Sequence, residues 1–344
     1  MGLGTIGFGL ISVGCSSDVS DAPDASLERP NAVAVTQQEL QQELQQQCNT
    51  DDEFAWVPEG NFGYGSDRAE RDYAYRISAL AIVRSPKSTQ SPEIPLDPEA
   101  VIQAEQRLRQ RRWFDREPQQ QVRSLPGFCI QKNLVTNADY HQFTQTTGHR
   151  APDISETDYQ TQGFLVHPYS SVERYRWIDQ QYPPGSDHHP VVLVSYNDAL
   201  AYAEWKGTQD QVQYRLPTAE EWEKAARGTE GIYFPWGNEW MDDATNWAET
   251  YQLTTVPNHS AQIQEPGTTA IATFPLSQSR YGINDMAGNV FEYTSTLRRR
   301  NNRTRSVMKG CSWDDLPGFC RAAYEHTRPI ESRHILFGFR LIKE

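Results

Sequence analysis

The chain has 344 residues, of which 37% are hydrophobic and 22% are charged, so it can bury a substantial core. Its net charge of −13 argues against a protein that binds nucleic acid or an anionic membrane through its overall charge. Nine tryptophans and sixteen tyrosines are typical of a core filled by large flat side chains.

Residues 1–15 have the pattern of an export signal. An uncharged, mostly apolar run over residues 2–14 precedes Cys15, and this ending resembles a bacterial lipoprotein cleavage box, in which the cysteine carries the lipid. The run is too short to span a bilayer, although it lacks the basic residues that normally begin a signal. We expect a protein of the bacterial cell envelope, periplasmic or on the outer surface. It would meet membrane only through a lipid anchor at Cys15, with residues 16–50 as a tether.

A lipidated Cys15 leaves four cysteines, at positions 48, 129, 311 and 320. In an oxidising compartment four cysteines allow three pairings, and the sequence alone does not choose among them. One of the pairings, Cys48 with Cys129, would anchor the N-terminal segment to the rest of the chain.

The first predicted elements are a marginal helix or spacer over residues 37–47 and a half-buried strand and turn over residues 54–66. In the second segment, aromatic residues alternate with other residues. After a proline-rich connector, Asp97 and Pro98 give the start signal of a helix that continues to Trp113.

Capping residues predict three further helices, and an apolar run predicts a buried strand. The helices are one capped by Asn137 and closed by Gly148, one over 196–206 behind the capping box Ser195/Asp198, and one behind Thr218/Glu221 that ends at Gly228; the strand covers residues 191–194. Helices mixed with short antiparallel strands indicate an α+β class.

Two short segments could carry binding. Residues 298–305 include five arginines in eight positions, which favours a solvated hairpin tip over an anion-binding patch. Residues 281–292 combine two carboxylates, two asparagines and two glycines. Folded tightly, Asp285 and Glu292 could share a calcium ion with intervening carbonyls, because calcium prefers oxygen ligands. The alternative is a polar turn before a strand.

Six ordered motifs resemble the formylglycine-generating enzyme family, also called the sulfatase-modifying-factor domain, over about five-sixths of the chain. The motifs are residues 56–66, 130–140, 189–195, 215–228, 281–292, and 309–313 with 338–340. The resemblance implies an irregular α+β fold related to C-type lectins, over a domain of residues 51–344. Residues 72–120 are then an insertion relative to the family pattern.

The resemblance also implies metal sites. Asp285 and Glu292 would give side-chain oxygens, and Gly288 and Val290 would give carbonyls, to a structural calcium ion. A second calcium site would begin at Asn246 and Trp247, but its partner aspartate is not found in residues 262–269.

In the family's enzymes, a pair of cysteines separated by four residues binds copper(I), and the pair oxidises a substrate cysteine with oxygen. Soft thiolates suit copper(I), and the chemistry needs both of them. Here Cys311 and Cys320 are the nearest candidates, with eight residues between them. A displaced thiolate site competes with a structural role for these two cysteines as packed or disulfide-bonded residues.

Two functions therefore remain open. The first is an exported oxidoreductase that acts on a protein or metabolite through a non-standard metal site at Cys311 and Cys320. The second is a non-catalytic, lectin-like binding or assembly module with a protein or peptide partner. In that case Tyr324, His326 and Arg328, together with Arg333, would line the binding groove.

Overall fold

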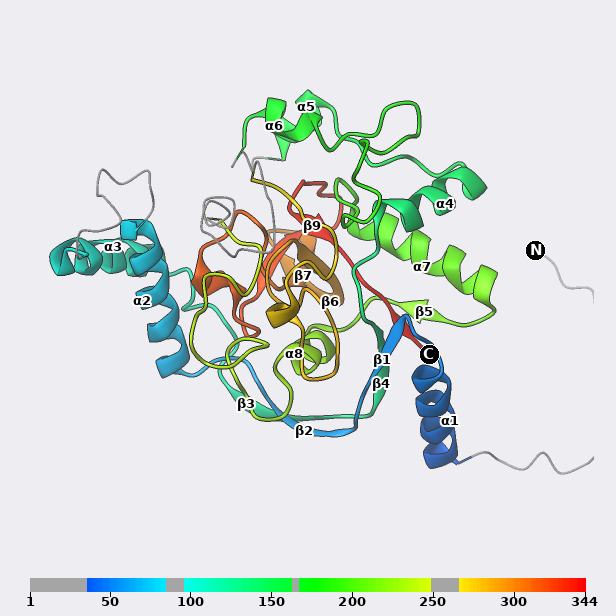
Figure 1. The fold of residues 1–344 in the computed structure, drawn as a ribbon, viewed down its shortest axis with the longest axis horizontal. Coiled ribbons are helices and arrows are strands. Elements are labelled where there is room, and N and C mark those ends of the chain that lie inside the picture. Colours follow the sequence, from blue (N-terminus) through cyan, green and yellow to red (C-terminus); the bar gives the residue numbers. More distant parts are fainter. Residues whose placement is uncertain (1–35, 85–95, 163–166, 249–265) are drawn as a thin grey trace, which may run out of the picture.

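The computed structural model describes residues 36–84, 96–162, 167–248 and 266–344 (Figure 1). The predicted signal, Cys15 and most of the tether lie outside these residues. The described helices are α1 Gln37–Asn49, α2 Arg68–Arg84, α3 Pro98–Arg111, α4 Asn137–Thr147, α5 Glu156–Thr161, α6 Tyr169–Glu173, α7 Tyr196–Asp210 and α8 Ala219–Arg227, with 3-10 turns η1 Pro275–Ser277 and η2 Pro317–Cys320. The described strands are β1 Phe54–Val57, β2 Gly60–Tyr64, β3 Gln121–Leu125, β4 Phe128–Gln131, β5 Tyr214–Arg215, β6 Phe291–Arg300, β7 Arg303–Lys309, β8 His326–Pro329, β9 Phe337–Gly338 and β10 Ile342–Lys343.

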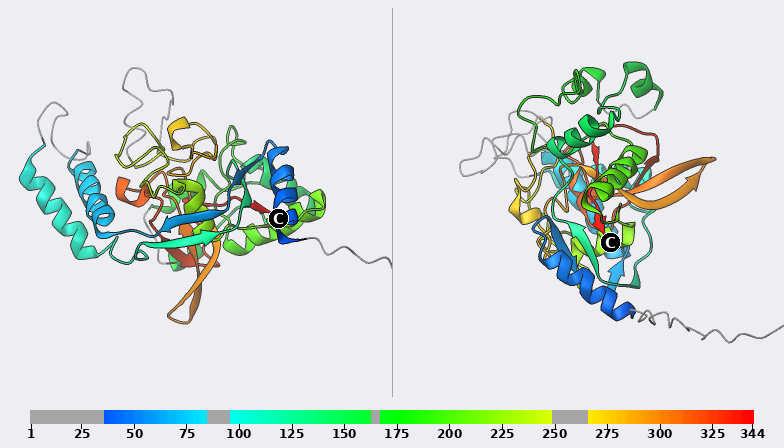
Figure 2. Two further views of the ribbon diagram at one scale, coloured as in Figure 1. Left: turned by 90° about the horizontal axis from the view of Figure 1, so that it is seen from below. Right: turned by 90° about the vertical axis from the view of Figure 1, so that its right-hand side faces the viewer.

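The strands form three small sheets, which confirms the predicted α+β class. Their orders are β1-β4-β10-β5, β2-β3 and β8-β7-β6-β9, and all pairs are antiparallel except β6 with β9. Because Ile342 of β10 pairs with both Ile130 and Arg215, the end of the chain joins segments far apart in sequence. Helices α2 and α3 lie on one side of the sheets and α7 and α1 on the other (Figures 1 and 2).

Helix α1 occupies residues that the sequence analysis assigns to the tether and to a marginal helix. Thr36 and Glu39 form a capping box at its start, and a disulfide joins Cys48 at its end to Cys129 of β4. Both sulfurs are buried. Of the three possible pairings, the structure contains Cys48–Cys129 and Cys311–Cys320.

The helix starts predicted from capping residues are confirmed with small shifts. Ser195 and Thr218 cap α7 and α8, whereas the cap of α4 is Thr136, one residue before the predicted Asn137. Helix α7 continues past the predicted end and closes at Gln211, which adopts a left-handed conformation.

The predicted strand at residues 191–194 is wrong. Its residues are fully buried, as the apolar run indicates, but Leu193 has φ of 60°, which interrupts an extended strand. The amides of Val191 and Leu193 donate to two separate segments, at the carbonyls of Val135 (2.9 Å) and His334 (3.1 Å).

No helix among the described residues is both long enough and apolar enough to cross a membrane.

Candidate functional site

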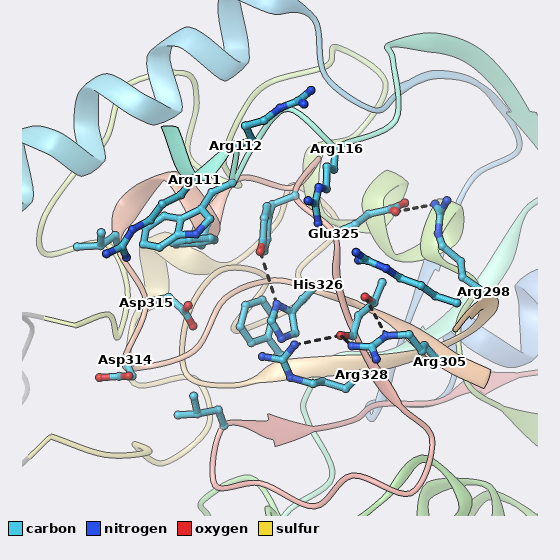
Figure 3. A pocket seen from close by; sticks show the side chains of 18 of the residues that line it. Arg111, Arg112, Arg116, Arg298, Arg305, Asp314, Asp315, Glu325, His326 and Arg328 are labelled. Atoms are coloured by element: carbon cyan, nitrogen blue, oxygen red, sulfur yellow. Dashed lines mark hydrogen bonds and ion pairs between the residues drawn. The ribbon is translucent and has the colours of Figure 1, made fainter. Parts of the chain in front are cut away.

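A cleft of about 820 Å³ lies between the β6–β7 hairpin, the end of α3 and the segment around η2 (Figure 3). We call it the arginine cleft. Its lining residues are Arg111, Arg112, Trp113, Arg116, Phe291, Arg298, Arg299, Arg300, Arg305, Asp314, Asp315, Leu316, Phe319, Tyr324, Glu325, His326, Thr327, Arg328 and Leu336. Eight of these side chains are arginines and three are carboxylates, so the lining is strongly cationic in a chain whose net charge is −13.

One wall is the β6–β7 hairpin, which projects from the body of the molecule (Figure 2). Its two-residue turn is Asn301 and Asn302, with φ of 51° and 57°. Positive φ at both positions is the geometry that suits a tight hairpin, and asparagine tolerates it. The run of residues 298–305 is therefore a hairpin tip, as predicted, and its arginines also line a cleft.

The opposite wall comes from the last residue of α3 and the residues that follow it. Arg112 ends the helix in a left-handed conformation with φ of 54°, and this turns the chain so that Arg116 also reaches the cleft. The guanidinium of Arg111 lies 5.1 Å from the ring of Trp113. Figure 3 shows Arg111, Arg112 and Arg116 on this side of the cleft, and Arg298, Arg305 and Arg328 on the side of the sheet.

Aromatic rings form the floor between these walls. Trp113, Phe319, Tyr324 and Phe291 follow one another with ring-centre separations of 5.2, 4.8 and 6.2 Å. The cleft therefore combines cationic walls with an apolar base.

A buried ionic cluster ties helices α2 and α3, which we call the helical arm, to the rest of the molecule. Arg321 bonds Glu70 of α2 at 3.2 Å and also pairs with Glu117, which follows α3. Arg227 of α8 bonds the other oxygen of Glu70 at 3.0 Å and, with Lys309 of β7, shares Glu223. All six side chains are at most 1% exposed. Burial raises the pKa of Glu70, and the two arginines oppose this.

Positive charges lie close together along the wall that strands β6, β7 and β8 form. Burial lowers the pKa of Arg305, and the nearby Arg300 and Arg303 lower it further. Burial likewise lowers the pKa of Arg328 to about 10. At the exposed rim Arg298 bonds Glu325 at 2.6 Å. Positive charges held this close together favour a bound anion.

Asp315 lies at the η2 side of the cleft. Its carboxyl accepts from the Ser312 amide at 3.0 Å and from the Ser312 hydroxyl. Burial raises the pKa of this group to about 7, so its charge changes near neutral pH.

The two candidate cysteines lie next to the cleft but are not free thiols. Cys311 and Cys320 are joined by a disulfide, both are fully buried, and the residues between them include four that line the cleft. Copper(I) would need both sulfurs as thiolates, so in this state the pair does not fit that metal, and we derive no chemistry through it.

The predicted calcium loop is tightly folded, with φ of 56° at Asp285 and 85° at Gly288. Asp285 is buried and accepts from the Ala272 amide at 2.9 Å. Both oxygens of Glu292 accept from Arg340, at 2.7 and 2.8 Å. Glu292 is therefore engaged in an ion pair, which leaves Asp285 as the one of the two predicted carboxylates without such a pair in the part of the chain that the structure describes. In the described residues no group of three or more His, Cys, Asp or Glu side chains could hold a metal.

The second predicted calcium position lies directly against this loop. The carbonyl of Asn246 accepts from the Asn289 amide at 3.0 Å, and its side chain donates to the Gly267 carbonyl at 2.9 Å. The buried Trp247 ring donates to the Asp242 carbonyl at 2.8 Å. The Asn246 carbonyl, the Asn246 side chain and the Trp247 ring thus all form hydrogen bonds to other groups of the protein.

Sequence reasoning found part of the arginine cleft. Tyr324, His326 and Arg328 line it, whereas Arg333 is buried elsewhere in an ion pair with Asp198 at 2.5 Å. Arg111, Arg112 and Arg116 were missed. Their signal in the sequence is the arginine-rich end of the predicted helix, but nothing in the sequence places that end opposite residues 298–305.

Comparison with known proteins assigns this architecture to a class. The family model for the sulfatase-modifying factor enzyme 1-like domain matches residues 39–344. The chain therefore belongs to the formylglycine-generating-enzyme-like family.

Individual relatives differ in how much they share. The bovine inactive C-alpha-formylglycine-generating enzyme 2 is 39% identical over 151 residues, which are 42% of this chain and 46% of that protein. The mouse formylglycine-generating enzyme is 28% identical over 259 residues, covering 70% of this chain and 67% of that one. The solved structure of PvdO from Pseudomonas aeruginosa has a TM-score of 0.55 at 19% identity, covering 85% of this chain and 94% of that one, and is evidence for the fold alone.

Proposed function

We propose that this chain is a non-catalytic binding module of the formylglycine-generating-enzyme-like family, with the arginine cleft as its binding site for a protein or peptide partner. The observation that carries this proposal is the buried Cys311–Cys320 disulfide, which leaves no thiolate pair beside the cleft. The similarity to a relative whose name calls it inactive supports the same conclusion.

A thiol-dependent oxidation at the same place is the second candidate function. It is favoured by the position of the disulfide, because residues 314–316 and Phe319, which lie between the two cysteines, line the cleft. Reduction would produce two thiols next to a cavity large enough for a ligand. This candidate requires the disulfide to open in the working protein.

Thiol counting and a Cu(I) titration without thiol reductant test whether this disulfide is open in the folded protein, which the oxidation requires and the binding module does not. We expect no reactive thiol from these four cysteines in the folded chain, and no stoichiometric Cu(I) binding that depends on Cys311 or Cys320. The variants Cys311→Ser and Cys320→Ser serve as controls. Tight binding of one copper ion that disappears in both variants would contradict the proposal and support the oxidase.

A further inference from the structure

We propose that the arginine cleft binds an acidic segment of a polypeptide in an extended conformation. This inference rests on the proposed function, since it names the chemical class of partner for the same cleft. Its basis is the meeting of two arginine-rich segments, 111–116 and 298–305, which are far apart in sequence and line one cavity (Figure 3).

The charge of the lining identifies the ligand as an anion. Planar guanidinium groups donate paired hydrogen bonds that match a carboxylate, and here they come from both walls. Arg298 is already bonded to Glu325 at 2.6 Å, which shows the type of contact that the wall makes with a carboxylate. Arg111 and Arg300 are exposed, so neither is fixed by burial in another role.

The rest of the molecule restricts the size of that anion. With a net charge of −13, the chain as a whole repels a polyanion or an anionic bilayer that extends beyond the cleft. A short acidic segment meets only the local positive field, which falls off over about 8 Å at physiological ionic strength. The cavity of about 820 Å³ suits a ligand of a few residues.

The aromatic floor favours a peptide over a small inorganic anion. Phe319 and Tyr324 lie 4.8 Å apart between the arginine walls, so apolar side chains can pack below while carboxylates meet the guanidinium groups. In an extended segment successive side chains point to opposite sides, which allows acidic and apolar residues to contact the walls and the floor in turn.

The two walls are held at a fixed separation before any ligand binds. Glu70 and Glu117 of the arm bond Arg321, which follows the disulfide, and all three side chains are at most 1% exposed. A rigid site loses less conformational entropy on binding than one that must assemble around the peptide.

The experiment uses the full chain. Binding is measured by the fluorescence anisotropy of a fluorescein-labelled peptide in which glutamates alternate with phenylalanines. The test variant is the double charge reversal Arg111→Glu with Arg300→Glu, one residue from each wall. The matched control is Arg68→Glu with Arg107→Glu. Both control residues are exposed, lie on α2 and α3, and are absent from the cleft lining, and Arg107 is one helical turn before Arg111.

We expect the acidic peptide to bind, the matched lysine peptide not to bind, and salt to weaken the complex. The test variant should weaken binding at least about tenfold, or about 1.4 kcal/mol, and the control less than about threefold. Equal losses in both variants, or no binding to the original protein, would overturn the proposal. Binding of inorganic phosphate or of phosphatidylglycerol vesicles in place of the peptide would also overturn it, in favour of a small anion or a membrane.

Failure of this inference is distinguishable from failure of the proposed function. The thiol count and the Cu(I) titration do not depend on Arg111 or Arg300. A cleft that does not bind acidic peptide, in a protein without copper-binding thiols, would leave the non-catalytic proposal standing and remove only this class of partner.

Discussion

Arg321 is the residue on which the position of the helical arm depends most directly. Its guanidinium is fully buried and pairs with two carboxylates, Glu70 and Glu117, that lie on either side of the α2–α3 arm. Removing one partner of a buried ion pair leaves uncompensated charge in a medium that solvates it poorly.

We therefore expect Arg321→Met to lower the free energy of unfolding by about 3–5 kcal/mol, measured by urea denaturation. Arg280→Met is the control, because Arg280 and its partner Glu230 have side chains that are 48% and 66% exposed. The control should cost at most about 1 kcal/mol. Similar losses in the two variants would mean that the buried cluster does not support the arm in this way.

Asp315 gives a prediction about pH. Burial raises the pKa of its carboxyl to about 7, against an ordinary value of 3.8. The folded protein therefore holds this proton more tightly than the unfolded chain does, so the contribution of this proton to stability is complete below about pH 4 and is lost as pH rises through about 7.

Asp315→Asn removes this titration while keeping a polar side chain beside Ser312. We expect the stability of the original protein to fall relative to that of the variant between about pH 4 and pH 7, as followed by thermal unfolding at a series of pH values. Parallel pH profiles for the two proteins would show that Asp315 titrates normally. The same proton removes a negative charge from the cleft, so the acidic peptide should bind the original protein more tightly at about pH 6 than at about pH 8, a range in which the peptide's glutamates stay ionised.

At the scale of elements, local signals predicted helix starts well and long-range geometry poorly. The capping boxes at Ser195 and Thr218 depend on contacts between residues three apart, which a sequence displays directly. Helix α2 was missed because it buries Glu70 and Ser78 alongside apolar residues, which blurs its amphipathic pattern. Leu193 was assigned to a strand because an apolar run does not reveal a positive φ.

The cleft was only partly predictable for the same reason. Segments 111–116 and 298–305 each display their arginines, but their meeting depends on the buried contacts of Arg321, which tie the arm to the domain. The calcium loop was visible as a cluster of oxygen donors, whereas the pairing of Glu292 with Arg340 required the structure.

The loop of residues 285–290 carries the third prediction. We propose that Asp285 and the carbonyls of Gly288 and Val290 bind calcium as a structural ion, since Asp285 is a buried carboxylate in the same tight loop and calcium prefers oxygen ligands. Calcium at a hundredfold excess over its dissociation constant should raise the free energy of unfolding by about 2.7 kcal/mol, measured by denaturation with and without a chelator.

Two variants distinguish the roles of the carboxylates. Asp285→Asn should abolish the dependence on calcium, whereas Glu292→Gln should destabilise the protein with or without the ion, because Glu292 pairs with the buried Arg340. A protein whose unfolding is indifferent to calcium and chelator would exclude a stabilising calcium ion at this loop.

At the scale of the whole molecule, the disulfides bear on the cellular compartment in which the protein functions. The described residues contain two disulfides, one of which fixes α1 to β4, and disulfides persist in oxidising compartments such as the bacterial periplasm or cell surface. This supports the proposal of an exported protein, which the sequence motivates independently through residues 1–15.

The last prediction concerns the lipid anchor at Cys15. A single acyl chain gives only marginal membrane binding, whereas the several chains of a bacterial lipoprotein should hold the protein in the membrane fraction. We expect Cys15→Ser to shift the protein to the soluble envelope fraction after expression with its own signal in a bacterial host. Thermal unfolding of the released protein should be unchanged, because Cys15 precedes the described residues and the four other described cysteines already form two pairs. Membrane retention of the serine variant, or intracellular accumulation with reduced cysteines, would contradict lipidation at Cys15 and export respectively.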